Sequence, residues 1–309
     1  MRGLDEAVRS AEAALFSRYR LSATDSVRAL PTSGEELRVW RWGSGEPVVF
    51  LHAAGLPATS WLPLAAELSG VQVHLVELPG HGLAGPSRIE PRPARRHGHL
   101  LVSELLDELS LSSAHLVGNS LGGTLGLWFA AACPERVRSF TAMGVPAPAL
   151  PGVAVPPLLS LLMARGIGPL VQRVPAPVRL FRVLISQILG RADAANAPRE
   201  LVEVARLSSR RPGNVRTLTT WLRELDGLRK PRPGSVLSSA DVESVRAPCL
   251  FLWGEDDPVM RLDRARSALE RFPSAVVQEV RGGHAPWLTS PGRCAELLTQ
   301  HLRNTGTAH

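Results

Sequence analysis

One serine of this chain stands in a segment whose spacing could expose it as a nucleophile. Residues 118–122 read Gly-Asn-Ser-Leu-Gly, after a stretch typical of a buried strand (114–117) and before one typical of a helix (124–132). A serine at the tip of so sharp a turn takes a strained backbone conformation with positive φ. Side chains two positions before and after it would collide across the turn, so glycine is needed at both places. We therefore expect Ser120 to face a reacting carbonyl group, with N–H groups of the helix directed at the same carbonyl.

An acidic cluster and a histidine follow two other apolar stretches and could activate that serine. The segment 254–258, Gly-Glu-Asp-Asp-Pro, comes directly after residues 249–253, and Gly-Gly-His284 comes just after the last predicted strand. A serine hydroxyl is a poor nucleophile until a neighbouring base removes its proton. Histidine can take this proton and later return it to the leaving group, and a carboxylate can hold the imidazole and stabilise its cation. His284 is the candidate base, and Asp256 and Asp257 are rival candidates for the acid.

The residues that must position these groups alternate between strand and helix patterns. Continuous apolar runs such as residues 48–52 are typical of central strands covered on both faces. Strands alternating with helices predict a parallel, doubly wound sheet of the α/β class, with ligands at the carboxyl ends of its strands. Each candidate group then follows a different strand, so all three can meet at one edge. The expected strands are 37–42, 48–52, 71–77, 114–117, 139–144, 249–253 and 276–280, and the expected helices around them are 3–20, 63–68, 99–109, 124–132, 262–272 and 293–302.

Residues 146–240 differ in composition from the rest of the chain. No strand pattern is evident there, and prolines punctuate short helical patterns at 158–164, 178–189, 199–207 and 215–225. We interpret this segment as a helical cap inserted between two strands of the sheet. The core domain would then comprise residues 1–145 and 241–309, with residues 1–30 as an N-terminal helical extension.

From about residue 37 to residue 302 the chain resembles the α/β-hydrolase superfamily, and within it the esterase-like serine hydrolases with a helical cap. The resemblance rests on three separated motifs in the order serine, acid, histidine. In the family pattern Gly-x-x-Asp, Gly254 points to Asp257 as the acid. The resemblance implies that Ser120 is the nucleophile, His284 the base and Asp257 the acid that orients it. It also implies an acyl-enzyme intermediate on the serine.

The same resemblance implies an oxyanion hole made of two backbone N–H groups. One belongs to Leu121, the residue after the serine, and the resemblance assigns the other to Ala54, in the loop after the first central strand. Relatives often have His-Gly-x in this loop, whereas this chain has His-Ala-Ala at 52–54. We interpret His52, and also His81 in Leu-Pro-Gly-His-Gly, as structural residues.

The nucleophile and the apolar residues near the motifs indicate a class of substrate. Epoxide hydrolases and haloalkane dehalogenases of the superfamily carry Asp at the position of Ser120, so the resemblance argues against both. Candidate substrate-binding residues are Trp61 and Trp287 near the motif loops and Leu158 and Leu162 in the cap, although each could equally belong to the core. The leading hypothesis is hydrolysis of a carboxylic ester or lactone of an apolar small molecule.

Two other functions remain open from the sequence. The segment Gly-Asn-Ser-Leu-Gly-Gly also resembles the serine hydrolases that cleave carbon–carbon bonds in ring-fission products, whose anionic substrates would suit an arginine-rich cap. Relatives in that group tend to have an aromatic residue after the catalytic histidine, whereas this chain has Ala285. The other alternative is a non-catalytic, receptor-like ligand-binding member of the fold. An intact set of Ser120, Asp257 and His284 ranks that alternative last.

Length and composition exclude several classes of protein. The 309 residues, with 44% hydrophobic content, suit one large α/β domain with an insertion. The net charge of +7 arises in residues 146–230, which hold twelve arginines and one lysine against five acidic residues, without a basic cluster interleaved with aromatics. We therefore expect a small-molecule substrate and no nucleic-acid partner. The sequence leaves open whether the protein is a monomer or a homodimer.

The sequence also bears on location, redox state and metals. No apolar run approaches the ~20 residues of a membrane span, and the N-terminus lacks a signal-peptide core, so a cytoplasmic location is expected. Cys133, Cys249 and Cys294 are widely spaced, which favours reduced thiols over a disulfide framework. His97 and His99 have no nearby ligand partners, and we expect neither a metal nor a cofactor.

Overall fold

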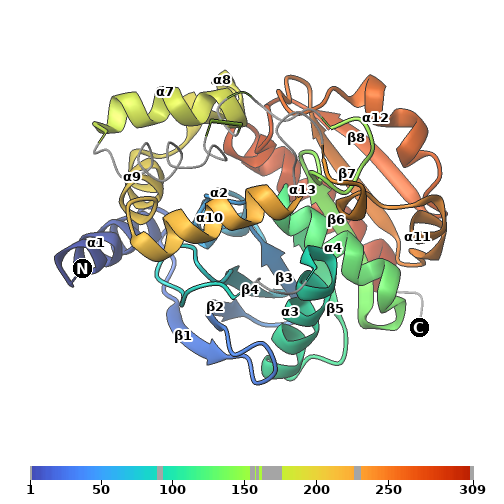
Figure 1. Ribbon diagram of the computed structural model, residues 1–309, viewed down its shortest axis with the longest axis horizontal. Helices are drawn as coiled ribbons and strands as arrows, with labels where there is room; N and C mark the ends of the chain where they lie inside the picture. Colours follow the sequence, from blue (N-terminus) through green and yellow to red (C-terminus); the bar gives the residue numbers. More distant parts are fainter. Residues whose placement is uncertain are drawn as a thin grey trace.

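An eight-stranded β-sheet runs through the middle of the protein, and helices cover both of its faces (Figure 1). The computed structural model describes residues 2–88, 93–153, 157, 160, 161, 176–225 and 231–306. Across the sheet the strands follow the order β1-β2-β4-β3-β5-β6-β7-β8. Their bounds are β1 Thr24–Ala29, β2 Glu36–Gly43, β3 Glu46–Leu51, β4 Val71–Glu77, β5 Ala114–Gly118, β6 Val137–Met143, β7 Cys249–Gly254 and β8 Ala275–Val280.

The strands from β4 to β8 in this order pair in parallel, whereas β2 pairs antiparallel with both β1 and β4. Strands β5 and β7 are buried along their whole length, because helices on both faces exclude water from parallel strands. The seven predicted strands all form, with bounds within two residues of those expected. The predicted fold class, a mostly parallel α/β sheet with inserted helices, is confirmed.

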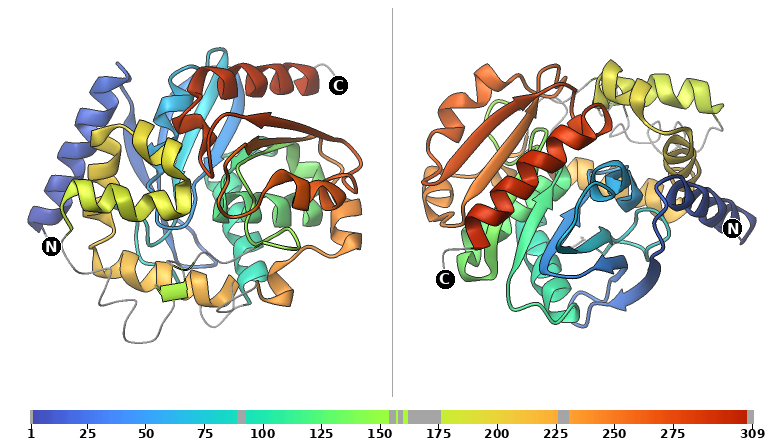
Figure 2. Two further views of the ribbon diagram at one scale, coloured as in Figure 1. Left: turned by 90° about the horizontal axis from the view of Figure 1, so that it is seen from above. Right: turned by 180° about the vertical axis from the view of Figure 1, so that it is seen from behind.

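Two sets of helices pack on opposite faces of the sheet (Figure 2). One face is covered by α3 (Ala94–Glu108), α4 (Leu121–Ala132), α11 (Ser239–Ser244) and α12 (Leu262–Leu269). The other face is covered by α1 (Arg2–Arg18), α2 (Leu62–Ala65) and α13 (Pro291–Gly306). Single 3-10 turns are η1 Ala58–Trp61, η2 Pro134–Arg136, η3 Pro233–Ser235 and η4 Pro286–Leu288. Every helix in the described ranges is too short or too polar to cross a lipid bilayer.

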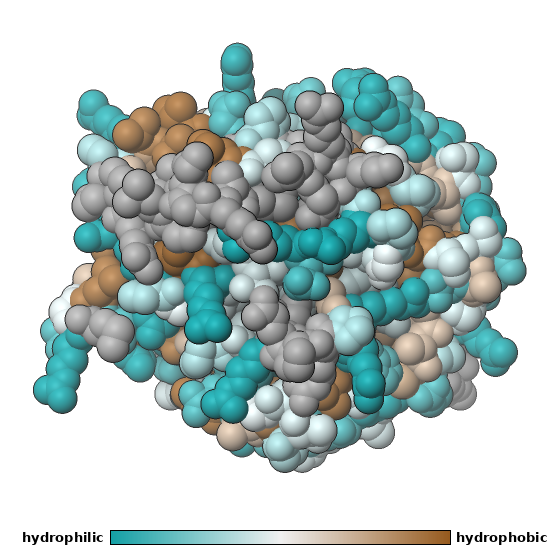
Figure 3. Space-filling view, in the orientation of Figure 1, coloured by the Kyte–Doolittle hydropathy of each residue, from teal (hydrophilic) through white to brown (hydrophobic). Residues whose placement is uncertain are grey.

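The regular elements described between β6 and α11 are all helical. They are α7 Val178–Leu189, α8 Arg191–Asn196, α9 Arg199–Ser208, α10 Pro212–Leu225 and η3. Helix α9 packs on α1, so the N-terminal helix contacts both the sheet and the inserted segment (Figures 1 and 2). Helix α7 exposes Leu180 and Val183, by 50% and 59%. Figure 3 shows an apolar area at the upper left, where Figure 1 draws α7.

Three short elements depart from the sequence patterns. Helix α1 ends at Arg18, and Thr24–Ala29 forms the edge strand β1, so the expected helical extension over residues 1–30 is wrong beyond its first helix. Strand β1 is mostly exposed and forms by pairing with β2, a long-range contact that periodicity does not reveal. Helices α8 and α11 have six residues each, too few to establish a helical period.

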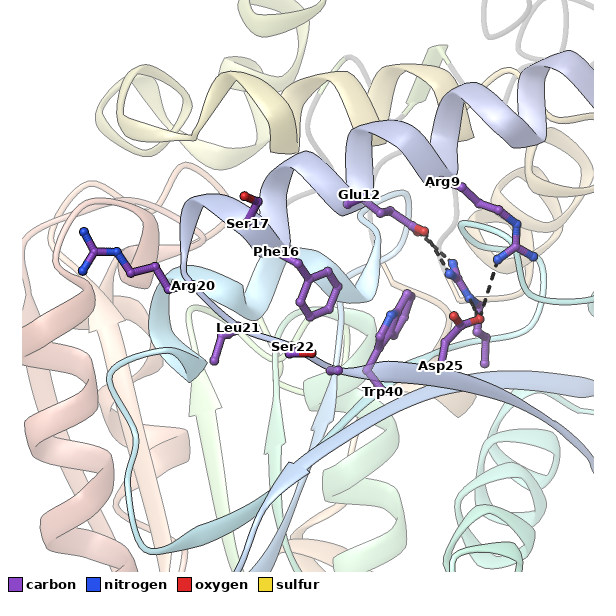
Figure 4. Close-up of a pocket in the computed structure, with 12 residues that line it drawn as sticks. Arg9, Glu12, Phe16, Ser17, Arg20, Leu21, Ser22, Asp25 and Trp40 are labelled. Carbon is purple, nitrogen blue, oxygen red and sulfur yellow. Dashed lines mark hydrogen bonds and ion pairs between the residues drawn. The ribbon is translucent and has the colours of Figure 1, made fainter.

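A buried ion-pair network joins α1 to the sheet (Figure 4). Arg38 on β2 donates two hydrogen bonds to the Glu12 carboxylate on α1, at 2.8 and 2.9 Å, and a third to Asp25 on β1, at 2.6 Å. The guanidinium carbon of Arg38 also lies 4.1 Å from the ring centroid of Trp40. Burial and the nearby Glu77 raise the pKa of Glu12 to about 7, against the opposing effect of Arg38. The network therefore depends on the cation of Arg38.

Arg38→Ala should strongly destabilise the protein, because it leaves Glu12 and Glu77 buried without their cation. We expect the free energy of unfolding to fall by about 3–5 kcal/mol, the usual cost of removing one partner of a buried ion pair. Urea denaturation followed by circular dichroism measures this. The control Arg261→Ala removes an exposed pair with Asp263 and should cost less than about 1 kcal/mol. Equal losses in the two variants would contradict the structural role of Arg38.

Candidate active site

Ser120 lies at the sharp turn between β5 and α4, with φ +50° and ψ −113°, so the expected positive φ is confirmed. A Cβ atom on Gly122 would lie 2.0 Å from the carbonyl oxygen of Leu51. One on Gly118 would lie 2.5 Å from the carbonyl oxygen of Gly122. Both distances are far inside van der Waals contact with backbone atoms, so the turn requires glycine at both positions. Ser120 remains partly exposed at the tip of this turn.

Backbone hydrogen bonds anchor the serine turn to the end of β3. The N–H of Asn119 donates to the carbonyl oxygen of Leu51 at 3.1 Å, and the N–H of Gly122 donates to that of His52 at 3.2 Å. Between them in the chain, the N–H of Leu121 has no hydrogen-bond partner within the described residues. This amide is available to an oxygen atom bound beside Ser120.

His284 and Asp257 meet on the loops that follow β8 and β7. Nδ1 of His284 lies 2.9 Å from Oδ2 and 3.2 Å from Oδ1 of Asp257. The buried carboxylate also accepts hydrogen bonds from the N–H groups of Val145, at 3.1 Å, and Val259, at 2.9 Å, which fix its orientation. Asp256, the rival acid, is exposed. The structure therefore brings Asp257, and not Asp256, to the imidazole.

The side chain of Asn119 joins the serine turn to the histidine loop. Its Nδ2 donates to the carbonyl oxygen of His284 at 2.8 Å and to that of Met143 at 2.6 Å. Asn119 is fully buried. Sequence reasoning treats it only as a member of the turn, although a polar residue inside an apolar strand-to-helix segment is a recognisable signal. Ser120 and His284 thus lie on backbone segments that one buried amide holds together.

Asp193 is a second residue that sequence reasoning misses. It lies on α8 in the inserted segment, and its Oδ2 accepts hydrogen bonds from the N–H groups of Gly283, at 2.9 Å, and Ala285, at 2.8 Å. No local pattern marks this contact, because its partners are about ninety residues further along the chain. The histidine loop is therefore held from the insertion as well as from the sheet.

The loop after β3 carries Ala54, whose N–H has no partner among the residues described. His52 fixes this loop: its Nε2 accepts the N–H of Leu78 at 3.0 Å, so Nδ1 carries the proton and donates to the carbonyl oxygen of Ala53 at 2.8 Å. Burial lowers the pKa of His52 to about 4, so the ring is neutral at pH 7. The ring of His81 packs edge-on against that of His52, with ring centroids 4.8 Å apart, and burial lowers the pKa of His81 to about 3. Both contacts agree with the expected structural role of these histidines.

Trp61 and Trp287, the expected substrate-binding aromatics, lie in the core. Both are fully buried, and their rings stack with centroids 3.9 Å apart. Nε1 of Trp287 donates to the carbonyl oxygen of Ser60 at 2.7 Å. The structure therefore assigns both rings to the core instead of a substrate pocket, because each covers the other. The other two candidates, Leu158 and Leu162, lie outside the described residues.

A cavity of about 670 Å³ lies away from these groups, between α1 and strands β1 and β2 (Figure 4). The candidate catalytic residues are not part of its wall. Three of its charged groups, Glu12, Asp25 and Arg38, bind one another. The residues that line it include Arg9, Glu12, Phe16, Asp25, Arg38 and Trp40.

Three arginines of the inserted segment bind groups of the protein itself. Arg182 donates to carbonyl groups at the end of α8. Arg206 pairs with Glu203 at 2.5 Å, and Arg211 pairs with Asp5 on α1 at 2.8 Å. The charges of Arg206 and Arg211 are thus compensated by a carboxylate, whereas Arg182 binds neutral carbonyl groups.

Known proteins of one family are similar to this chain over most of its length. The model of the family described as "Alpha/beta hydrolase family" matches residues 48–297. A 2-hydroxy-6-oxononadienedioate/2-hydroxy-6-oxononatrienedioate hydrolase of Burkholderia vietnamiensis is 30% identical over 295 residues, which cover 91% of this chain and 96% of that protein.

Two solved structures are similar in fold. A Bacillus subtilis carboxylesterase has a TM-score of 0.76 at 18% identity, over 97% of this chain and 98% of its own. A 2-hydroxy-6-oxo-6-phenylhexa-2,4-dienoate hydrolase from a Rhodococcus strain has a TM-score of 0.72 at 21% identity, over 91% of this chain and 100% of its own. At these identities the two structures show similarity of fold alone.

Gly122→Ala should disrupt the serine turn, because the added methyl group would lie 2.0 Å from the carbonyl oxygen of Leu51. We expect thermal or urea denaturation to show a loss of roughly 1–3 kcal/mol in the free energy of unfolding, as for other overpacked sites. The matched control is Gly213→Ala on α10, where nothing lies within 4 Å of the added atom and alanine favours the helix. If both variants are as stable as the wild type, the turn is not sterically constrained.

Proposed function

This chain belongs to the alpha/beta hydrolase family, and we propose that it is a serine hydrolase with Ser120 as nucleophile, His284 as general base and Asp257 as orienting acid. The observation that carries the proposal is the hydrogen bond between Nδ1 of His284 and the buried Asp257 carboxylate. His284 lies on a loop that the side chain of Asn119 connects to the strained serine turn. A buried acid, a histidine and an exposed serine are the groups that activate a hydroxyl for attack.

The proton path follows from the two nitrogen atoms of His284. The Asp257 carboxylate can only accept a hydrogen bond, so Nδ1 carries the proton of the neutral ring and Nε2 keeps its lone pair. Nε2 takes the proton of Ser120 as the serine oxygen attacks the substrate carbonyl carbon. Asp257 stabilises the imidazolium that forms, and the imidazolium then protonates the leaving group. Water repeats the same steps on the acyl-enzyme.

The N–H groups of Leu121 and Ala54 are the donors that we propose for the oxyanion. Both lack a partner within the described ranges, and Leu121 is the first residue of α4, where the helix dipole favours negative charge. One such donor typically contributes about 3–4 kcal/mol to transition-state stabilisation. His52 takes part as a positioning residue, since it fixes the loop that carries Ala54.

We propose that the substrate is a ring-fission product, a conjugated dienoic acid that carries a ketone. The Burkholderia vietnamiensis relative is named for such a 2-hydroxy-6-oxo compound and matches nearly the whole chain. Hydrolysis at a ketone breaks a carbon–carbon bond, and a conjugated acid can accept the electrons of that bond. Serine adds to a ketone carbonyl as it does to an ester carbonyl, so the same three residues suffice. The sequence motifs alone favour an ester, whereas the relatives favour this alternative.

An ester or lactone of an apolar small molecule is the second candidate. Ala285 follows the histidine where carbon–carbon hydrolases tend to have an aromatic residue. Arg206 and Arg211 of the insertion, whose charge would suit an anionic substrate, are each paired with a carboxylate of the protein. Both observations weaken the case for an anionic substrate without affecting the serine chemistry.

We infer that α7 to α10 belong to a cap, residues 146–240, over a core of residues 1–145 and 241–309. Helix α10 packs on the loops after β3 and β4: Leu218 faces Gly55, the residue after Ala54, and Thr217 faces Gly80. Such a cap covers the oxyanion loop and helps exclude water from the reaction. The substrate would then bind between α10 and the carboxyl ends of the strands.

Ser120→Ala and His284→Ala should each lower turnover by roughly 10⁴-fold or more without unfolding the protein. Asp257→Asn should cost less than either, and Asp256→Asn, on an exposed side chain, should leave turnover nearly unchanged. Intact-mass labelling with a fluorophosphonate probe should show one adduct on the wild type and none on Ser120→Ala. A folded wild type that takes no label would favour the non-catalytic, ligand-binding reading, and equal effects of the two aspartate substitutions would refute the choice of Asp257.

The substrate class is tested by comparing kcat/KM for a 2-hydroxy-6-oxo dienoate, followed by loss of its conjugated absorbance, with kcat/KM for p-nitrophenyl butyrate. We expect the dienoate to be preferred by about tenfold or more, which corresponds to about 1.4 kcal/mol of transition-state stabilisation. Ser120→Ala is the control for both assays. Preference for the ester would reverse the order of the two candidates.

A further inference from the structure

Three consecutive backbone N–H groups around His284 all donate to the inserted segment. Gly283 and Ala285 donate to Oδ2 of Asp193, at 2.9 and 2.8 Å, and His284 donates to the carbonyl oxygen of Leu189, at 2.8 Å. Leu189 ends α7 and Asp193 lies in α8, so both acceptors belong to one helix junction. The backbone of the histidine loop is therefore fixed by a segment that is not part of the sheet.

Both carboxylate oxygens of Asp193 are engaged. Oδ1 accepts the hydroxyl of Thr289 at 2.6 Å, while Oδ2 accepts the two amides beside His284. The side chain is fully buried, and burial raises the pKa of Asp193 while these hydrogen bonds and His284 oppose the rise. A buried carboxylate is costly unless its acceptors are used, so its three hydrogen bonds are the reason that this position tolerates it.

Two glycines before His284 make this close approach possible. A Cβ atom on Gly283 would lie 2.1 Å from the carbonyl oxygen of Leu189. One on Gly282, whose φ is +138°, would lie 2.9 Å from Oδ1 of Asp193. Contact with the insertion thus requires glycine at 283, while the positive φ and the backbone of Pro286 also favour glycine at 282.

We propose that Asp193 is a positioning residue that fixes His284 between Asp257 and Ser120. This inference rests on the proposed function, because it assumes that His284 is the base. Asp257 holds the imidazole, and Asn119 holds the carbonyl group of His284. Leu189 holds the N–H of His284, and Asp193 holds the two neighbouring amides. It follows that a displacement of α7 and α8 relative to the sheet also displaces the base.

Three substitutions of Asp193 distinguish the effect of its hydrogen-bond geometry from the effect of its charge. Asn can direct its carbonyl oxygen at the amides of Gly283 and Ala285 and its NH₂ group at the Thr289 hydroxyl, so Asp193→Asn keeps the contacts and removes the charge. Asp193→Glu keeps the charge but is one methylene too long for the site. Asp193→Ala removes the contacts altogether.

We expect kcat to stay within about threefold of the wild-type value in Asp193→Asn. In Asp193→Glu and Asp193→Ala we expect it to fall by roughly ten- to a hundredfold, with KM within about twofold, because a misplaced base affects the chemical step. The control is Asp241→Ala, which removes a partly exposed ion pair with Arg95 and one side chain of the capping box of α11, and should lower Tm without changing kcat. Wild-type kcat in folded Asp193→Ala or Asp193→Glu would overturn the proposal, as would equal losses in Asp193→Asn and Asp193→Ala.

A measurement on the histidine itself separates this inference from the proposed function. The Nδ1–H proton of His284, hydrogen-bonded to Asp257, should give a downfield proton NMR signal that is lost in His284→Ala. We expect the signal to persist in Asp193→Asn and to shift or broaden in Asp193→Glu, which also decides the matter if Asp193→Ala does not fold. An unchanged signal in Asp193→Glu would overturn the positioning role. A wild type that shows the signal but neither fluorophosphonate labelling nor turnover would instead refute the hydrolase function.

Discussion

The site depends on one close approach, that of the end of β3 to the first turn of α4. At Gly122 the two backbones are so near that any side chain would meet the carbonyl group of Leu51. The hydrogen bonds of Asn119 and Gly122 to the end of β3 maintain this contact. They force the positive φ of Ser120, leave the N–H of Leu121 without a partner in the described part of the chain, and bring the loop of Ala54 beside the serine. The proposed nucleophile and both proposed oxyanion donors are thus consequences of a single packing contact.

His284, the proposed base, is held by a different part of the molecule. Ser120 is fixed by the sheet, whereas the backbone around His284 is fixed by the junction of α7 and α8, and Asn119 joins the two. The distance between nucleophile and base therefore depends on how the insertion sits on the sheet. Helix α1 contributes to that placement, because it packs on α9 and is bound to β2 through Arg38. A buried ion pair remote from the reaction can in this way support its geometry.

The sequence predicts those parts of the structure that are determined by residues close together in the chain. Apolar runs set seven of the strands, and the spacing of two glycines sets the conformation of Ser120, since both are local effects. Strand β1 and the contact of Asp193 escape prediction because each arises from pairing between segments far apart in the chain. Trp61 and Trp287 show that closeness to a motif in the sequence does not by itself place a side chain in the substrate pocket. An aromatic residue next to a catalytic loop can turn towards the pocket or the core, and only packing decides between them.

The arginines illustrate the same limit for charge, and they change the grounds on which a substrate can be argued. A basic insertion suggests an anionic ligand, but Arg182, Arg206 and Arg211 bind carbonyl and carboxylate groups of the protein itself. Net charge counts every side chain, whereas a ligand meets only those that remain unpaired. The preference for a ring-fission product therefore rests on the relatives and on the reactivity of a ketone towards an activated serine. In this proposal the insertion contributes to catalysis through one buried acidic residue, Asp193, more than through its many arginines.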